Sequence, residues 1–410
     1  MATVPVERPP LRANRHFWLL WIGQATSTLG SHSSAIAITL LVLALTDSPA
    51  YAGLVEFIAT GSMMAMLLPA GVIADRVNRR QLMRWCDAGR AAVMATLALS
   101  LTFGRPPLVA LLGLVLSNGL LSALFRAAES GAVRQVVTDA DLPTAVAHTQ
   151  AYQQAAVVGG PPLGGLLYAL GRSLPFLIDA VSYLVSYLAI TAIRIPLQES
   201  RELQQPRQSM QQRLLEGLRW IFVVPFLRAS VVYVTAFTFI ASALVLIVMV
   251  RANSHGANPT EIGVMFALSG IGGIAGALTT PWIQQRWPPG TVLLMLGGVW
   301  AVVIPLLTTT THAILLGGIL VILGFSIPPT NTILVSFLMS VTPDRLQSQA
   351  YASMTLVTIS SAPLGSLAAG FLLTAIGSTG SLVLLTVVTV IVVSASVSAL
   401  RPDTHPLDTA

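Results

Sequence analysis

The sequence predicts an all-α polytopic membrane protein, and three observations lead to this class. Hydrophobic residues make up 54% of the 410 residues and charged residues only 9%, whereas a soluble domain carries about 25% charged residues. The mean hydropathy is +0.77. The apolar runs, such as 313–323 and 382–393, are apolar on nearly every face, which does not fit the alternating pattern of a membrane β-barrel. Helices are therefore the expected spanning elements.

Twelve apolar spans can be traced between positions rich in Gly, Pro, Asp and Arg. Each has room for the roughly 20 residues that a helix needs to cross a hydrocarbon layer about 30 Å thick. The spans begin near His16, Tyr51, Arg84, Pro107, Thr144, Leu174, Arg228, Thr260, Gly290, His312, Ala350 and Gly380.

One long polar segment, residues 196–219, separates the first six spans from the last six. The predicted organisation is a tail (1–15), a six-helix bundle (16–194), a central loop (195–219), a second six-helix bundle (220–400) and a tail (401–410). No small-residue cleavage site follows the first span, so we expect the first helix to remain as a signal-anchor. Residues 210–222 predict either an amphipathic helix on the inner membrane surface or a charged linker without fixed structure.

The charge distribution predicts the orientation of the chain. The net charge is +6, and every basic residue is an arginine. Most arginines fall on the side that holds both predicted termini, which the positive-inside rule assigns to the cytoplasm. We therefore expect a multi-pass protein of the cell inner (cytoplasmic) membrane with both termini cytoplasmic. The loop arginines account for the basic balance, so no nucleic-acid partner is predicted. The single cysteine, Cys86, excludes an internal disulfide and a cysteine-based metal cluster.

The sharpest motif lies in the loop after the second span, where Asp75 precedes a run of arginines within residues 71–80. One interpretation is topology alone, because arginines hold a loop on the cytoplasmic side. That interpretation leaves Asp75 unexplained, since acidic residues add little to topology. An acid at the membrane edge can instead accept hydrogen bonds from a helix N-terminus and from arginine, forming a latch that can break.

The same loop resembles the G-x-L-a-D-r-x-G-r-R motif of the major facilitator superfamily. The resemblance rests on Gly71, Asp75, Arg76, Arg79 and Arg80. Asn78 stands where the motif has glycine, and we expect asparagine to preserve a left-handed turn there. The resemblance implies two six-helix bundles. The predicted cytoplasmic gate consists of Asp75, Arg76, Arg79 and Arg80, with Glu129 as a further candidate.

Further segments resemble the branch of that superfamily that includes enterobactin and macrolide exporters. They are residues 17–30, 176–183, 216–219 and 342–344. In the fifth span, residues 159–165 resemble the G-P-x-x-G-G element that the superfamily associates with antiporting exporters. The expected element is Gly160, Pro161, Gly164 and Gly165, although Ala156 stands where the pattern has a further glycine. The alternative for this segment is a packing kink, because prolines remove amide donors and glycines permit close helix approach.

Ionisable residues inside the spans are candidates for proton coupling, because each costs a few kcal/mol at the bilayer centre unless it is paired or hydrated. Glu56 lies about 8 Å deep in the second span, either as the proton carrier or snorkelling to the outer surface. Asp179 is interpreted mainly as a structural hydrogen-bonding group. Arg126 and Glu129 either neutralise each other at i, i+3, or Glu129 joins the gate. His32 stands near the position where the exporter branch often has an acid, as a proton site or as a packing residue.

The predicted function is that of a secondary active transporter that exports a small amphipathic molecule by alternating access and proton antiport. A drug, an antibiotic or a siderophore-like metabolite would fit, and multidrug resistance would be a possible phenotype. The alternatives are a proton-coupled importer of a small metabolite or a non-transporting membrane sensor. Residue type alone suggests cavity candidates, each of which is equally well explained as helix packing: Gln24, Asn118, Gln153, Tyr233, Asn331 and Met354.

No enzyme is predicted. Without lysine the chain cannot contain the G-x-x-x-x-G-K-[ST] loop that binds nucleotide phosphates. No metal-ligand spacing and no paired catalytic serine and histidine can be read, so no metal and no cofactor is expected. The expected partners are a small-molecule substrate, protons as the coupling ion and the lipid bilayer, and the expected state is a monomer.

Overall fold

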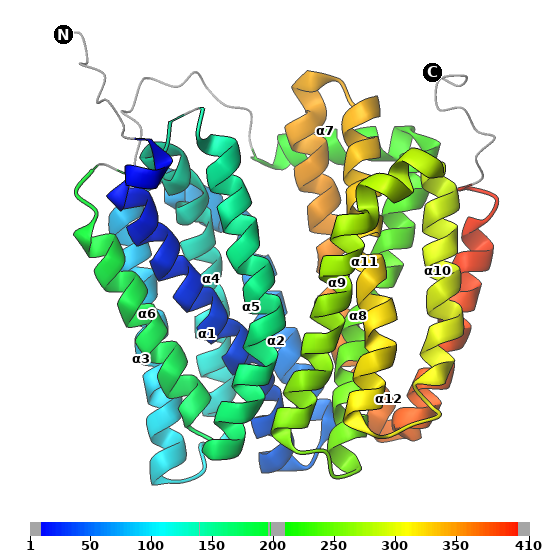
Figure 1. The fold of residues 1–410 in the computed structure, drawn as a ribbon, viewed down its shortest axis with the longest axis horizontal. Helices are drawn as coiled ribbons and strands as arrows, with labels where there is room; N and C mark the ends of the chain where they lie inside the picture. Colours follow the sequence, from blue (N-terminus) through cyan, green and yellow to red (C-terminus); the bar gives the residue numbers. More distant parts are fainter. Residues whose placement is uncertain (1–9, 139, 196, 198–209, 401–410) are drawn as a thin grey trace. The chain divides into compact units, whose positions relative to one another are not determined.

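The computed structural model describes residues 10–138, 140–195, 197 and 210–400, and these residues are almost entirely helical (Figure 1). The elements in chain order are η1 (Leu11–Ala13), α1 (Arg15–Thr46), α2 (Pro49–Arg76), α3 (Arg79–Phe103), α4 (Leu108–Val136), α5 (Leu142–Leu170), α6 (Leu174–Ala192), α7 (Met210–Val223), α8 (Pro225–Ser254), α9 (Pro259–Arg286), α10 (Pro289–Leu306), α11 (Ala313–Val341) and α12 (Asp344–Ser396).

The sequence predicts twelve spans, whereas the described residues contain nine helices that are long and apolar enough to cross a membrane. The difference from twelve arises at three places. α12 covers the eleventh and twelfth predicted spans as a single element, but it consists of two helices that meet at Gly377, where φ of +69° and ψ of 178° are not helical. α3 and α5 coincide with the third and fifth predicted spans, but they carry more polar side chains and are not among the nine.

The chain divides into two compact units. Unit 1 comprises Met1–Ile38 and Gly61–Gln204, and unit 2 comprises Thr39–Thr60 and Gln205–Ala410. In unit 1, α3 packs against α4 and α6, and in unit 2 the pairs α8/α12 and α9/α11 pack along one another (Figure 1). The tip of the α1–α2 hairpin, residues 39–60, belongs to unit 2, whereas the sequence placed it in the first bundle.

Helix starts follow from local chemistry. The Asn78 side chain caps α3 by accepting a hydrogen bond from the backbone N–H of Gln81 at 3.2 Å. The φ angle of Asn78 is −60°, so the expected left-handed turn is wrong, and the bend between α2 and α3 is made by an N-cap instead. Asn258 and Glu261 form a reciprocal capping box at the start of α9.

The central segment forms a helix where an amphipathic helix was predicted. α7 packs against α12, and the indole Nε1 of Trp220 donates to the Thr342 hydroxyl at 3.0 Å. The backbone oxygen of Leu214 accepts from the Ser353 hydroxyl of α12 at 3.0 Å. The rest of the predicted central loop, 198–209, and the tail residues 1–9 and 401–410 lie outside the described residues.

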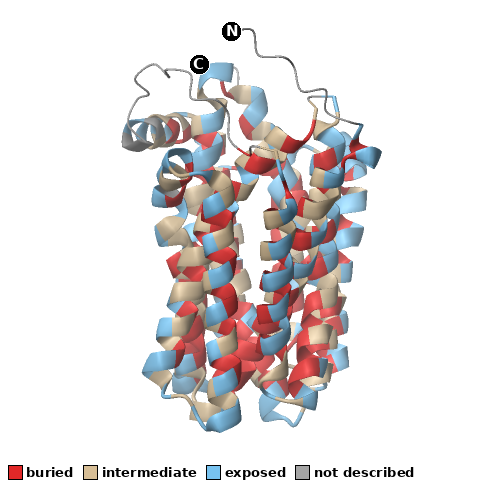
Figure 2. Cartoon of the chain, turned by 90° about the vertical axis from the view of Figure 1, so that its left-hand side faces the viewer, coloured by how far each residue is buried: buried red, intermediate tan, exposed pale blue. Residues whose placement is uncertain are grey.

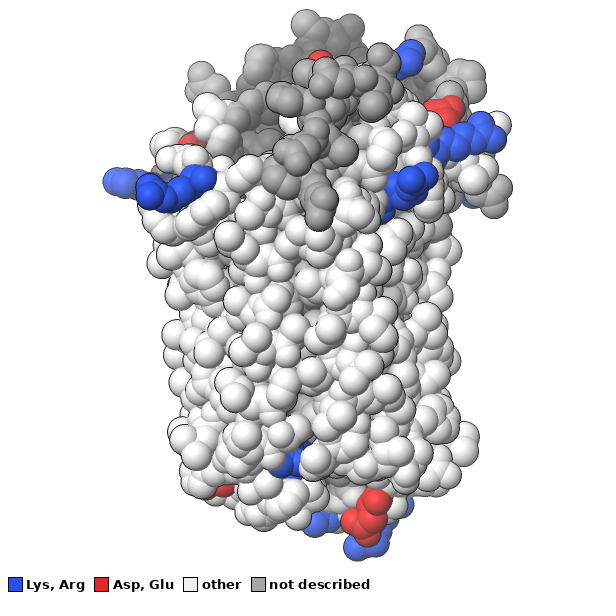
Figure 3. Space-filling view, turned by 90° about the vertical axis from the view of Figure 1, so that its right-hand side faces the viewer, with Lys and Arg blue, Asp and Glu red and all other residues white. Residues whose placement is uncertain are grey.

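The outer surface is apolar. Large side chains such as Phe103 and Leu278 are 88% and 78% exposed, and exposed residues follow the outward helix faces while buried residues follow the faces between helices (Figure 2). On the face of the molecule in Figure 3, charged side chains gather at the two ends and leave an uncharged belt between them. An apolar belt of this kind is suited to lipid, so the molecule is a multi-pass membrane protein.

Candidate functional site

The turn between α2 and α3 carries the predicted gate residues, and the structure separates them. The Asp75 carboxylate pairs with Arg79 at 3.4 Å, and the Asp75 side chain is 59% exposed. Arg80 instead donates to the backbone oxygens of Ile190 and Thr191 at the end of α6. This second contact ties the turn to α6, whereas Arg76 is exposed at the end of α2.

Glu129 and Arg126 face different partners on α4. The Glu129 carboxylate accepts a hydrogen bond from the Tyr152 hydroxyl of α5 at 3.2 Å, and an Arg126 Nη lies 3.9 Å from the sulfur of Met63 on α2. In this structure these contacts of Glu129 and Arg126 are therefore neither with each other nor with Asp75. The gate remains a prediction.

The glycine and proline element of the fifth span lies inside one continuous helix, α5. Gly160, Pro161, Gly164 and Gly165 are all buried. A Cβ on Gly164 would lie 2.2 Å from the backbone oxygen of Ser33, and one on Gly160 would lie 2.4 Å from the Cβ of His32. Only glycine therefore allows α1 to approach α5 this closely, and His32 is held half-buried in that contact.

Glu56 lies on the hairpin tip that belongs to unit 2. Its carboxylate accepts a hydrogen bond from the Thr39 hydroxyl across the hairpin, from α1 to α2. The side chain is half-buried rather than turned fully outward. This partner makes Glu56 part of the hairpin's own packing, and its predicted role in proton coupling remains a prediction.

Unit 1 also contains a buried charged cluster, which we define as Asp87, Arg90 and Asp179. Asp87 and Arg90 form an ion pair on α3, and Asp179 on α6 accepts hydrogen bonds from Ser34 at 2.6 Å and from Ser182 at 3.2 Å. All three side chains are buried. Sequence reasoning overlooked Asp87 and Arg90, although an acid and an arginine at i, i+3 inside an apolar run were a readable signal.

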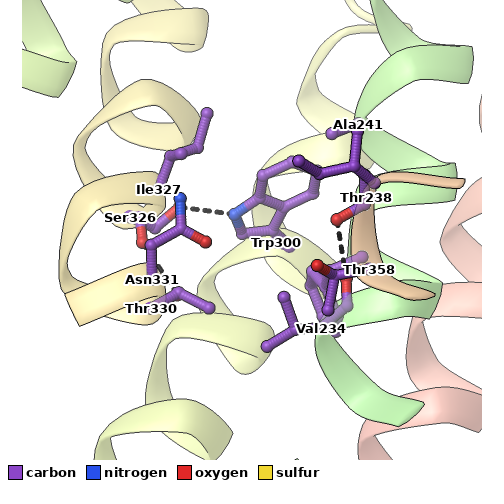
Figure 4. Close-up of a pocket in the computed structure, with 11 residues that line it drawn as sticks. Val234, Thr238, Ala241, Trp300, Ser326, Ile327, Thr330, Asn331 and Thr358 are labelled. Atoms are coloured by element: carbon purple, nitrogen blue, oxygen red, sulfur yellow. Dashed lines mark hydrogen bonds between the residues drawn. The ribbon is translucent and has the colours of Figure 1, made fainter. Parts of the chain in front are cut away.

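A pocket opens among α8, α10, α11 and α12 in unit 2, with a volume of about 260 Å³. The Trp300 side chain of α10 lies between side chains of α11 and α8 that line the pocket (Figure 4). The indole Nε1 donates to the Ser326 hydroxyl at 2.5 Å, and the ring lies 5.5 Å from that of Phe237 in an edge-to-face arrangement. The lining residues carry no charge: Val234, Phe237, Thr238, Ala241, Trp300, Ser326, Ile327, Thr330, Asn331, Thr358 and Ile359.

Of the predicted cavity residues, one lines the pocket and others pack between helices. Asn331 lines the pocket. Tyr233 is 2% exposed and donates to the Leu293 backbone oxygen at 2.7 Å, so it packs in the core beside the pocket. Met354 is also buried, and Gln24 is buried with its amide donating to Ser186 at 3.1 Å.

The other two predicted cavity residues belong to unit 1, as Gln24 does. Gln153 is half-buried on α5. Asn118 of α4 has a buried side-chain oxygen without a hydrogen-bond partner among the described residues. The pocket residues that residue type failed to single out are Phe237 and Trp300, because aromatic side chains in apolar spans give no signal that separates a pocket wall from lipid contact or core.

Comparison with known proteins identifies relatives along nearly the whole chain. A family model described as "Transmembrane secretion effector" matches residues 8–409. The enterobactin exporter EntS of Shigella flexneri is 24% identical over 288 residues, which cover 70% of this chain and 67% of that protein. The uncharacterized MFS-type transporter YkuC of Bacillus subtilis (strain 168) is 27% identical over 191 residues, covering 46% of this chain and 44% of YkuC.

Solved structures share the fold at low sequence identity. The nucleoside transporter NupG aligns with a TM-score of 0.74 and 14% identity, covering 94% of this chain and 99% of NupG. A bacterial homolog of the human lysosomal transporter Spinster aligns with a TM-score of 0.73 and 14% identity, covering 95% of this chain and 98% of that one. The fold is therefore that of the major facilitator transporters, as predicted.

Proposed function

The chain belongs to the transmembrane secretion effector family, and from this premise we propose that it exports a small amphipathic molecule by proton-coupled antiport. Membrane transport is the activity of the whole family and of the solved neighbours, not catalysis. Similarity to the exporter EntS supports the outward direction. Alternating access, in which one half of the transporter rocks against the other, is the cycle expected of this fold.

The uncharged pocket of unit 2 is the observation that carries the substrate class. Its wall combines the aromatic rings of Phe237 and Trp300 with aliphatic side chains, and its polar side chains are Thr238, Ser326, Thr330, Asn331 and Thr358. Such a wall favours a largely apolar ligand with a few hydrogen-bonding groups over a strongly charged one, because a charge would enter without a counter-charge. A drug, an antibiotic or a neutral siderophore-like metabolite fits that description.

The distribution of arginines bears on the location and orientation of the protein. Arginines gather at the ends of α2, α4, α9 and at the start of α3, with Arg105, Arg172 and Arg251 at the opposite helix ends. This bias supports a place in the inner membrane with both termini in the cytoplasm. The protein would then act as a monomer on substrate drawn from the cytoplasm or the inner leaflet.

The test is accumulation of a panel of uncharged aromatic fluorophores and antibiotics in efflux-deficient bacterial cells. Cells expressing the protein should accumulate less of at least one compound, and a protonophore should abolish the difference. Trp300→Ala should raise accumulation, because loss of one aromatic contact costs about 1 kcal/mol, roughly fivefold in affinity. Trp282→Ala is the matched control, since Trp282 lies on α9 outside the pocket and is 58% exposed.

Protein level in the membrane is measured for every variant, so that a loss of folding is not mistaken for a loss of binding. Trp300→Phe keeps an aromatic ring and loses only the hydrogen bond to Ser326, so it should fall between the wild type and Trp300→Ala. Asp75→Asn tests the predicted gate in the same assay. Equal accumulation with and without the folded protein, across the whole panel and at any proton gradient, would refute export of this substrate class.

A further inference from the structure

We propose that the buried charged cluster is a proton-binding site in the interior of unit 1, with Asp179 binding the proton and Arg90 responding to its charge. The inference rests on the proposed proton coupling and names the residues that carry it. Asp87 and Arg90 come from α3 and Asp179 from α6. The ligand of this site is a proton taken from water.

Arg90 is held between two rings and is incompletely paired. Its guanidinium carbon lies 4.2 Å from the ring centre of Phe125 and 4.4 Å from that of Tyr183. One Nη donates to one oxygen of Asp87. Arg90 Nε and the second Asp87 oxygen are buried and have no hydrogen-bond partner among the described residues. The ion pair therefore leaves one N–H donor of Arg90 and one carboxylate oxygen of Asp87 without a partner. Burying such unsatisfied polar groups costs free energy.

Asp179 has hydroxyl partners and no cation in contact. It is 0% exposed, and its donors are the hydroxyls of Ser34 and Ser182. The ion pair of Arg90 is with Asp87, so Arg90 does not bridge to Asp179. Tyr183 follows Asp179 by four residues, one helical turn, and Arg90 stacks on that ring. Arg90 thus lies near Asp179 while its ion pair is with Asp87.

Charge balance assigns one proton to the cluster. Arginine stays charged in proteins, so with both carboxyls ionised the cluster would carry a net negative charge in an apolar interior, which is expensive. One bound proton makes it neutral. Asp87 already contacts the guanidinium, so Asp179 is the carboxyl that takes the proton.

The surrounding groups do not change this balance. Glu129 and Arg126 of α4 are one acid and one base, so with both ionised they add no net charge to it. Four further titratable groups on the neighbouring helices are neutral in their ordinary forms: His32 of α1, Cys86 of α3, Tyr152 of α5 and Tyr183 of α6. Counting all of these groups again leaves one proton to be bound.

Release of the proton would act on helix packing. An ionised Asp179 attracts Arg90, whose free Nε is available to bridge it, and a shared guanidinium would draw α3 toward α6. α1 lies directly on the acid, because a Cβ on Gly30 would sit 2.7 Å from an Asp179 oxygen. The hydroxyl of Ser34, also on α1, donates to that carboxyl. One proton therefore changes the contacts of three helices at once.

The test is pH-difference infrared spectroscopy of the purified full-length protein in lipid nanodiscs, observed in the C=O stretching region of protonated carboxylic acids. The wild type should show a band that disappears as pH rises, and Asp179→Asn should lose it. Asp87→Asn should keep that band but change the pH at which it disappears. Glu261→Gln is the matched control and should keep the band, since Glu261 forms only the capping box of α9.

If Asp179→Asn does not fold, Ser34→Ala answers the same question, because loss of its hydrogen bond should shift the frequency of the band. An unchanged band in both variants would overturn the proposal. A band that depends on Asp179 without any proton-driven efflux would leave the site standing and refute proton-coupled export. Gradient-driven efflux that survives in Asp179→Asn, with the band unchanged, would refute the site and leave the export function standing.

Discussion

Gly53→Ala offers a direct test of how the α1–α2 hairpin tip contacts α12 within unit 2. An added Cβ at this position would lie 2.6 Å from the backbone oxygen of Ser366 and 2.9 Å from the Cα of Gly370. Both neighbours are backbone atoms of one helix, so they cannot rotate away as a flexible side chain would. Overpacking of this kind costs about 1–3 kcal/mol.

The overpacking weakens the contact between the hairpin tip and α12 and leaves the stability of each helix itself unaffected. A helix interior otherwise gains up to about 1 kcal/mol when glycine becomes alanine, so Gly113→Ala, with nothing within 4 Å of its added Cβ, should leave the contact unchanged and stabilise α4 slightly. The two substitutions are chemically identical and should act in opposite directions. A loss of 1–3 kcal/mol corresponds to about a 5- to 150-fold rise in the population in which the hairpin has left α12.

The assay is alkylation of a cysteine placed in the contact. Cys86 is the single cysteine, so Cys86→Ser with Ser366→Cys gives one reporter, at a side chain that is 6% exposed. A membrane-impermeant maleimide should react faster when Gly53→Ala is added and at an unchanged rate when Gly113→Ala is added. An unchanged rate in folded Gly53→Ala protein would refute the claim that this close approach holds the hairpin on α12.

Three further predictions follow from particular contacts. Arg251→Met should lower the free energy of unfolding by at least about 3 kcal/mol in thermal or denaturant unfolding, because the buried guanidinium donates to the α10–α11 loop and to α12 beside the bend; Arg251→Lys should recover part of the loss. Gly164→Ala should abolish efflux or folding, because its Cβ would strike the Ser33 backbone oxygen, whereas Gly159→Ala should be tolerated in the same efflux and membrane-level measurements. Asn78→Ala should cost about 1 kcal/mol of stability and Asn78→Gly only a few tenths; equal losses would contradict the N-cap.

The membrane class and the fold were readable from sequence because they depend on properties that add up along the chain. Long apolar runs fix where helices lie, and the bounds of α6 and α8 agree with the predicted starts at Leu174 and Arg228 to within a few residues. The predicted start of the twelfth span near Gly380 lies close to Gly377, where two helices meet within α12.

The candidate sites were less predictable, because partners far apart in sequence decide them. Asp179 was expected to form hydrogen bonds, and its donor Ser34 lies 145 positions away. Glu129 was expected either to pair with Arg126 or to join the gate around Asp75, and its partner in this structure is Tyr152 of α5. Trp300 was not singled out, since its position on a pocket wall follows from packing among four helices and not from any motif.

The uncharged pocket wall has an evolutionary consequence. Its side chains come from four helices of unit 2, whereas the proposed proton site lies wholly in unit 1. If the pocket binds the cargo as proposed, single substitutions at its wall would change which molecules bind without changing the charges that would drive the cycle. Paralogues of this chain should diversify their cargo mainly through α8, α10, α11 and α12, and exchanging those helices between relatives should transfer cargo preference while the energy source stays the same.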